Sequence, residues 1–149
     1  MRIEVETAQQ MWLACEDSLP ADIAICAAAV ADWRPAEMHG QKIKKSGEAP
    51  SIALVENPDI LAQLAHHAQR PGLLIGFAAE TENLEENARA KLARKGCDWL
   101  VANDVSQGVF GGDENEVVLF MKNHEERLPR MSKRVVAEAI VEKIISVIA

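Results

Sequence analysis

The chain has 149 residues, of which 48% are hydrophobic and 26% are charged, so it can bury one sizeable core and does not have the composition of a disordered protein. Its 16 Lys and Arg against 23 Asp and Glu give a formal net charge of −7, which argues against a general nucleic-acid binder, because such proteins need a basic face. No apolar run is long enough to span a membrane and no signal peptide opens the chain, so we expect one soluble, acidic, cytoplasmic domain over residues 1–149.

Helical and strand patterns alternate along the first half of the chain. In chain order they predict a helix over 7–17, a strand over 22–30, a long exposed loop over 32–50, a short strand over 51–55 and a helix over 57–68. Thr7 and Gln10 have the spacing of a capping box at the start of the first helix. The strand over 22–30 is continuously apolar, which is typical of a strand buried on both faces of a parallel sheet. Asn57 is the predicted N-cap of the second helix, because Pro58 then takes its first position.

The alternation continues in the second half. The patterns predict a strand over 73–77, a helix over 83–95, a strand over 99–102, an antiparallel hairpin of 117–121 with 126–129, and a last helix after Ser132. Gly96 closes the third helix. One face of the last helix is apolar and consists of Val136, Ala139, Ile140, Ile144 and Val147. The whole order predicts an α/β fold, in which helices flank a mostly parallel sheet that ends in a C-terminal antiparallel hairpin.

Small residues followed by polar ones mark the ends of three predicted strands. These ends are Asp32, residues 78–81 and residues 103–104. In an open parallel sheet, ligands bind beyond the carboxyl ends of the strands, so these positions are candidates for a site, with Trp33 as a candidate wall. The same residue types are also ordinary caps and turn formers, so each position alone stays ambiguous.

Lysines supply a second candidate feature. Lys91 and Lys95 are four residues apart on the third predicted helix and therefore share a face, while Lys42, Lys44 and Lys45 lie in the long loop. Together they could gather the phosphates of a nucleotide or of a phosphorylated substrate. The alternative is a solvated helix face and a solubilising loop.

Several familiar site motifs are missing from the sequence. It contains no Walker A motif, no dinucleotide-binding fingerprint, no zinc-ligand spacing and no Ser/His/Asp arrangement. Cys15, Cys26 and Cys97 are far apart in apolar segments, which predicts reduced, buried thiols. The residues themselves therefore predict an anion-binding site on an α/β sheet, with no metal ligands from the protein.

Five motifs, in one order and spacing, make the chain resemble a known family. They are Ala27-Ala-Ala-Val-Ala-Asp32-Trp-Arg-Pro, Lys42-Ile-Lys-Lys45, Asn57-Pro-Asp-Ile60, Gly76-Phe-Ala-Ala-Glu-Thr81 and Ala102-Asn-Asp-Val-Ser-Gln107. They resemble the phosphopantothenate–cysteine ligase domain of bacterial bifunctional coenzyme A biosynthesis proteins, where it follows a flavin-dependent phosphopantothenoylcysteine decarboxylase domain. The resemblance covers essentially the whole chain and implies a Rossmann-like, three-layer fold.

The resemblance implies a CTP-dependent ligation in two steps, assisted by Mg²⁺. The carboxylate of 4′-phosphopantothenate attacks the α-phosphate of CTP, giving an acyl-cytidylate and pyrophosphate, and the amine of cysteine then displaces CMP. The resemblance also implies a homodimer, in which the hairpin after Gly112 is the dimerisation element and the loop of Lys42 reaches toward the partner's site. FMN would belong only to the decarboxylase domain, which is absent here.

Site residues also follow from the resemblance. Lys42 is implied as the catalytic residue that stabilises charge during cytidylyl transfer, Phe77 as packing against the cytidine, and Lys91 and Lys95 as phosphate ligands. The full set implied in CTP binding is Ala27, Ala28, Asp32, Lys42, Asn57, Pro58, Asp59, Ile60, Phe77, Lys91 and Lys95.

The chain departs from the family at its start. It lacks the Gly-rich phosphate-binding turn and the Ser-Asn-Arg-Ser-Ser-Gly-type segment that begin the family's ligase domain. We therefore interpret it as an N-terminally truncated ligase domain, and expect it to bind CTP but to be weak or inactive in complete ligation. Without its usual first strand, the sheet is expected to have an exposed edge or apolar patch that could favour self-association.

Two other functions remain open at this point. One is a non-catalytic nucleotide-binding or dimerisation module, which would bind CTP without releasing pyrophosphate. The other is a Rossmann-type dehydrogenase, which the missing dinucleotide fingerprint disfavours.

Overall fold

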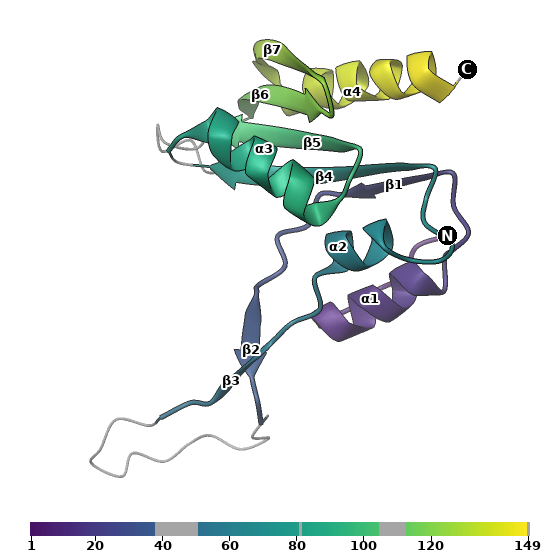
Figure 1. Cartoon of the computed structure of the whole chain (residues 1–149), viewed down its shortest axis with the longest axis vertical. Helices are drawn as coiled ribbons and strands as arrows, with labels where there is room; N and C mark the ends of the chain where they lie inside the picture. The colour runs from purple at the N-terminus through teal and green to yellow at the C-terminus, as the bar shows by residue number, and fades with distance from the viewer. Residues whose placement is uncertain (38–50, 81, 105–112, 149) are drawn as a thin grey trace.

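The computed structural model describes residues 1–37, 51–80, 82–104 and 113–148. Figure 1 shows one sheet with helices on both of its faces, and a two-stranded arm that extends away from this body. The elements are α1 (Ala8–Glu16), β1 (Ile23–Cys26), β2 (Trp33–Pro35), β3 (Leu54–Glu56), α2 (Ile60–Ala65), β4 (Leu73–Glu80), α3 (Leu84–Lys95), β5 (Trp99–Asp104), β6 (Glu114–Met121), β7 (His124–Ser132) and α4 (Lys133–Ile148).

The sheet has the order β1-β4-β5-β6-β7. β1, β4 and β5 are parallel neighbours, and the antiparallel hairpin of β6 and β7 extends the sheet on the side of β5. This arrangement confirms the predicted α/β fold with its parallel strands and C-terminal hairpin. It also places the carboxyl ends of β1, β4 and β5 at the same end of the sheet, beyond the last residues of these strands.

Each face of the sheet buries its own apolar core, because successive side chains of a strand point to opposite faces. Leu74 and Leu100 belong to the core beneath α1, α2 and α3, whereas Ile75 and Val101 belong to the core beneath α4. Helices on both faces give the predicted three layers. Val147 was predicted on the buried face of α4 but is 60% exposed, because the last turn of α4 extends beyond the hairpin strands (Figure 1).

The strand predicted over 22–30 is shorter and more exposed than expected. β1 covers only four residues, none of them fully buried, and Ile25 is 49% exposed. The prediction of burial on both faces was wrong because β1 lies at the end of the sheet order, where β4 is its single strand partner among the described residues.

The predicted loop over 32–50 contains a strand at its start. β2 pairs antiparallel with β3, with Trp33 opposite Glu56, and the two strands form the arm of Figure 1 instead of joining the main sheet. The predicted strand over 51–55 is present only in part, as β3, which begins three residues later and ends one residue later. The rest of the predicted loop, residues 38–50, lies outside the described residues.

The cap of the second helix differs from the prediction. Asp59, and not Asn57, is the N-cap of α2, since its side chain accepts a hydrogen bond of 3.2 Å from the backbone N–H of Ala62. The Asn57 side chain instead donates to the carbonyl of Ala31 at 2.8 Å. α2 ends at Ala65, so Ala68 lies beyond its apolar face.

Predictions based on local signals agree with the structure. Thr7 and Gln10 form both hydrogen bonds of the capping box at α1. Gly96 ends α3 with φ of 71°, in the left-handed region that glycine adopts without strain. The Ser132 side chain accepts a hydrogen bond of 3.3 Å from the backbone N–H of Val135 at the start of α4.

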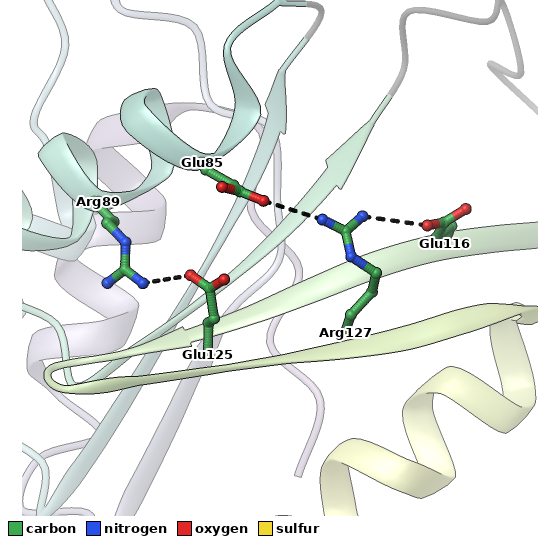
Figure 2. Close-up of polar contacts among 5 residues, drawn as sticks. All are labelled: Glu85, Arg89, Glu116, Glu125 and Arg127. Atoms are coloured by element: carbon green, nitrogen blue, oxygen red, sulfur yellow. Dashed lines mark hydrogen bonds and ion pairs between the residues drawn. The ribbon is translucent and has the colours of Figure 1, made fainter.

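Ion pairs fasten α3 to the hairpin (Figure 2). Arg89 of α3 pairs with Glu125 of β7, and its guanidinium carbon lies 5.4 Å from the centre of the Phe120 ring. Arg127 of β7 pairs with Glu85 of α3 at 3.1 Å and with Glu116 of β6 at 3.3 Å. The face of α3 that carries Glu85 and Arg89 is therefore turned toward the hairpin.

Candidate functional site

A cavity of about 650 Å³ lies where β1 and β4 end. Its walls come from the segment that follows β1, the turn before α2, the end of β4 and one face of α3, with Met11 and Cys15 of α1 completing it. Because β1 and β4 are parallel, their carboxyl ends meet at the same edge, and the segments that leave them diverge and open a space.

Small residues form much of the wall beside the strands. Residues 27–31 and the pair Ala78 and Ala79 line the cavity, so a ligand can approach the backbone closely. Gly76 lies two residues before Ala78 in β4, where an added Cβ would come within 2.5 Å of Leu61 Cδ2. A glycine at this position therefore allows Leu61 of α2 to pack on the strand and to line the cavity.

Asn57 forms hydrogen bonds that connect two walls of the cavity. Its Nδ2 donates to the Ala31 carbonyl at 2.8 Å, and its backbone N–H donates to the Asp32 carbonyl, also at 2.8 Å. Arg34 donates to Asn57 Oδ1 at 3.3 Å and to the Glu56 carbonyl. These bonds hold the segment after β1 against the turn that leads to α2, so Asp32 and Pro58 line the same space.

Three cations of α3 form the opposite wall: Lys91, Arg94 and Lys95. Lys91 Nζ lies 3.8 Å from Glu80 Oε1 at the end of β4, and Lys95 Nζ pairs with the Asp59 carboxylate. Lys95 is the more sheltered of the two lysines, with a side chain that is 17% exposed against 28% for Lys91. The two lysines are thus held at the cavity by carboxylates on neighbouring elements.

Asp59 remains ionised beside these cations. Burial alone would raise its pKa, but hydrogen bonds from Lys95 and from the Ala62 N–H, with the nearby charges of Lys95 and Arg94, lower the pKa below its ordinary value. An anion that enters the cavity therefore competes with the Asp59 carboxylate for Lys95, while Arg94 adds positive charge to the same wall.

The cavity thiols are poor nucleophiles. Burial, with a smaller effect of Cys15 and Cys97, raises the pKa of Cys26 to about 11, and burial also raises the pKa of Cys15. Both thiols are protonated at neutral pH, and thiol reactivity requires the thiolate. All three cysteines are free, as predicted, but only Cys97 is fully buried.

Sequence-predicted site residues largely come together here. The cavity is lined by Ala27, Ala28, Asp32, Asn57, Pro58, Asp59, Ile60, Phe77, Lys91 and Lys95. Lys42, with Lys44 and Lys45, lies outside the described residues, as does Thr81. Trp33 does not line the cavity, because it begins β2 in the arm and is 54% exposed, and Asn103 of β5 does not line it either.

Arg94 is the cavity residue that the sequence reasoning missed. It follows Lys91 by three residues, so the helical spacing that singled out Lys91 and Lys95 would also have placed Arg94 on their side of α3.

The acidic residues of the cavity suit a divalent cation that is held partly by the protein and partly by the phosphates of a bound ligand. Within the described ranges, no group of three His, Cys, Asp or Glu residues could hold a metal ion. Asp32 and Asp59 are the acidic residues that line the cavity. Mg²⁺ usually takes one or two carboxylates together with substrate phosphates, so this set would suit Mg²⁺ brought in with a phosphorylated ligand.

Comparison with known proteins gives the family. The family model of the DNA/pantothenate metabolism flavoprotein C-terminal domain matches residues 1–148. The chain belongs to this family. The coenzyme A biosynthesis bifunctional protein CoaBC of Haemophilus influenzae is 47% identical over 146 residues, which are 97% of this chain and 36% of that protein. The family resemblance drawn from the five motifs is thereby confirmed.

Solved structures of the family share the fold. A crystal structure of the C-terminal domain of a CoaBC protein matches with a TM-score of 0.75 and 34% identity, over 98% of this chain and 67% of that one. The DNA/pantothenate metabolism flavoprotein from Streptococcus pneumoniae matches with a TM-score of 0.79 over 97% of this chain and 72% of that one, and its 21% identity supports the fold alone. This family member therefore spans about a third of the curated relative and about two thirds of the solved domain.

Among the residues described, no helix combines the length and the hydropathy needed to cross a bilayer.

Proposed function

We propose that the chain carries the CTP-binding part of a phosphopantothenate–cysteine ligase of coenzyme A biosynthesis. One observation carries the proposal: ten of the eleven residues that the family resemblance implies in CTP binding line one cavity of about 650 Å³ at the carboxyl ends of parallel strands. Four of these residues, Asn57 to Ile60, lie before β4 in the chain and are separated from α3 by that whole strand, so the convergence does not follow from helical spacing alone.

The chemistry of the walls suits a nucleoside triphosphate. The phosphates would lie against Lys91, Arg94 and Lys95, which neutralise charge, and the cytidine would lie between Asn57–Ile60 and Phe77. The alanine-rich wall would let the backbone of residues 27–31 approach the nucleotide. When bound, Mg²⁺ would offset the remaining charge of the phosphates.

In the proposed reaction, the carboxylate oxygen of 4′-phosphopantothenate forms a bond to the α-phosphorus of CTP while the bond to pyrophosphate breaks. The amine of cysteine then attacks the acyl carbon of the acyl-cytidylate, CMP leaves, and the amine loses a proton. Neither step needs a nucleophilic side chain, which agrees with the raised pKa values of the cavity thiols.

Turnover of CTP tests the proposal against its alternatives. The chain would be mixed with CTP, Mg²⁺, 4′-phosphopantothenate and cysteine, and pyrophosphate and CMP would be measured by mass spectrometry. We expect slow pyrophosphate release that requires 4′-phosphopantothenate and disappears in Lys95→Ala. CTP binding without any release would favour a nucleotide-binding module, and binding of NAD in place of CTP would contradict both functions.

A further inference from the structure

Arg34 links the two-stranded arm to the walls of the candidate nucleotide cavity. It lies in β2, where its backbone pairs with that of Val55 in β3. Its side chain reaches across the base of the arm, since Nη1 donates to the Glu56 carbonyl and, at 3.3 Å, to Asn57 Oδ1. The arm leaves the body beside the segment after β1 and the turn before α2, as Figure 1 shows. Arg34 therefore lies where these two cavity walls meet the arm.

The contact with Arg34 fixes the orientation of the Asn57 amide. A guanidinium only donates hydrogen bonds, so Asn57 turns Oδ1 toward it. The amide nitrogen Nδ2 then faces the carbonyl of Ala31, to which it donates at 2.8 Å. Each end of the amide thus bonds to a different segment, and the amide joins the segment after β1 to the base of the arm.

Arg34 does not itself line the candidate nucleotide cavity. It lines a neighbouring cavity of about 570 Å³, together with Asn57 and residues 28–31. Residues 28–31 also line the nucleotide cavity, so this wall borders open space on two sides. Because such a wall has few packing contacts to fix it, its position depends on hydrogen bonds, and Arg34 is bonded to the residue that holds it.

We propose that Arg34 is a positioning residue of the nucleotide cavity and that it acts through Asn57. It keeps residues 28–31 and the turn before α2 at the separation that a bound nucleotide requires, and it touches neither the nucleotide nor Mg²⁺. Without Arg34, the two walls would be ordered only when the nucleotide binds, and this cost would weaken binding. The inference rests on the proposed function, because CTP is taken as the ligand of the cavity.

Amide exchange in the chain without nucleotide tests the positioning by itself. The backbone N–H of Asn57 donates to the Asp32 carbonyl at 2.8 Å, and its exchange with deuterium can be followed by nuclear magnetic resonance. We expect Arg34→Ala to speed this exchange at least tenfold. Arg130→Ala, which removes an exposed arginine from its pair with Glu114 on the hairpin, should leave it unchanged. Equally slow exchange in Arg34→Ala and in the unchanged chain would overturn the proposal.

Calorimetric titration with CTP and Mg²⁺ then separates positioning from direct contact. We expect Arg34→Ala to weaken CTP binding at least fivefold, and Arg34→Lys, which can still donate to both oxygens, to stay within twofold of the unchanged chain. Asn57→Ala should weaken binding as well, and adding Arg34→Ala to it should have no further effect, because Arg34 acts through Asn57. Losses that multiply in the double variant would show that Arg34 meets the ligand itself and would overturn the proposal, as would unchanged CTP binding by Arg34→Ala.

The two measurements keep this proposal separate from the proposed function. If the unchanged chain binds no CTP, the proposed function fails, and the exchange of Asn57 alone decides whether Arg34 holds the wall. If Arg34→Ala does not fold, both measurements are made with Arg34→Gln, whose single amide nitrogen cannot replace the guanidinium at both oxygens. Faster exchange and weaker binding in that variant support the proposal, and values equal to those of the unchanged chain overturn it.

Discussion

Asp59 performs two tasks at the candidate site. Its carboxylate caps α2 through the Ala62 N–H and pairs with Lys95 of α3, so one side chain joins two helices at the rim of the cavity. Because Asp59 is 44% exposed, solvent screens this pair, and its contribution to stability is modest. The pair positions Lys95 more than it stabilises the fold.

The charge of Asp59 makes stability depend on pH. Its folded pKa is lowered, so its contribution is present above the unfolded pKa of about 3.9 and is lost as pH falls through the folded value. Asp59→Asn keeps a capping side chain but removes the charge, and should lower the free energy of unfolding by about 0.5 kcal/mol at pH 7. Urea denaturation should show this difference shrinking toward zero as pH falls from the unfolded pKa of Asp59 through its lower folded pKa.

Asp22→Asn is the control for Asp59→Asn, since Asp22 is exposed and lies outside the cavity. It should show no comparable pH-dependent difference. A loss of stability in Asp59→Asn that stays constant down to pH 3 would contradict the account, because it would reflect lost capping instead of the charge.

At the scale of elements, α3 uses two of its faces: one lines the cavity and the other contacts the hairpin. Lys91, Arg94 and Lys95 line the cavity, while Glu85 and Arg89 engage the hairpin (Figure 2). Each ion pair is at least partly exposed and is therefore weak alone. Acting together with the packing of Ala88 and Leu92 in the core, they fix the rotation of α3 and so the direction of its three cations.

Removing a contact between α3 and the hairpin should lower the free energy of unfolding by more than removing an ion pair within a single helix. Arg89→Ala removes the ion pair with Glu125 and the contact with the Phe120 ring, and should cost about 1 kcal/mol of unfolding free energy. Arg134→Ala removes only an i,i+4 pair with Glu138 on α4 and should cost about 0.3 kcal/mol. Equal losses in chemical denaturation would show that Arg89 does not anchor α3.

Local signals explain which elements could be predicted. The capping box at Thr7, the glycine that ends α3 and the hairpin all depend on residues close in sequence. The family resemblance led us to expect an exposed sheet edge, but the residues of 22–30 alone could not show that β1 forms it, because this depends on which strands pair in space. The cap at Asn57 was misassigned for a similar reason, since its amide binds Ala31, 26 residues away.

The candidate site was predicted unevenly. Helical spacing alone found Lys91 and Lys95, and the family motifs added the residues of the turn before α2 and of the segment after β1. Trp33 was misplaced because the pairing of β2 with β3 carries it into the arm, away from the cavity. Arg94 was missed although its spacing was visible in the sequence.

At the scale of the whole molecule, the charge is distributed unevenly. The chain carries a formal net charge of −7, yet one wall of its cavity gathers three cations from a single helix. An acidic surface discourages general binding of polyanions, whereas a local positive wall next to small residues suits one compact anionic ligand. This contrast is what the proposed CTP site explains.

Calorimetric titration of this chain with CTP and Mg²⁺ tests the nucleotide site most directly. It would be run beside ATP, with Lys91→Ala as the site variant and Lys122→Ala, in the exposed hairpin turn, as its control. The account predicts saturable CTP binding that Lys91→Ala weakens at least tenfold and that Lys122→Ala leaves unchanged. No CTP binding by a chain that circular dichroism shows to be folded, or binding that both variants leave intact, would contradict it.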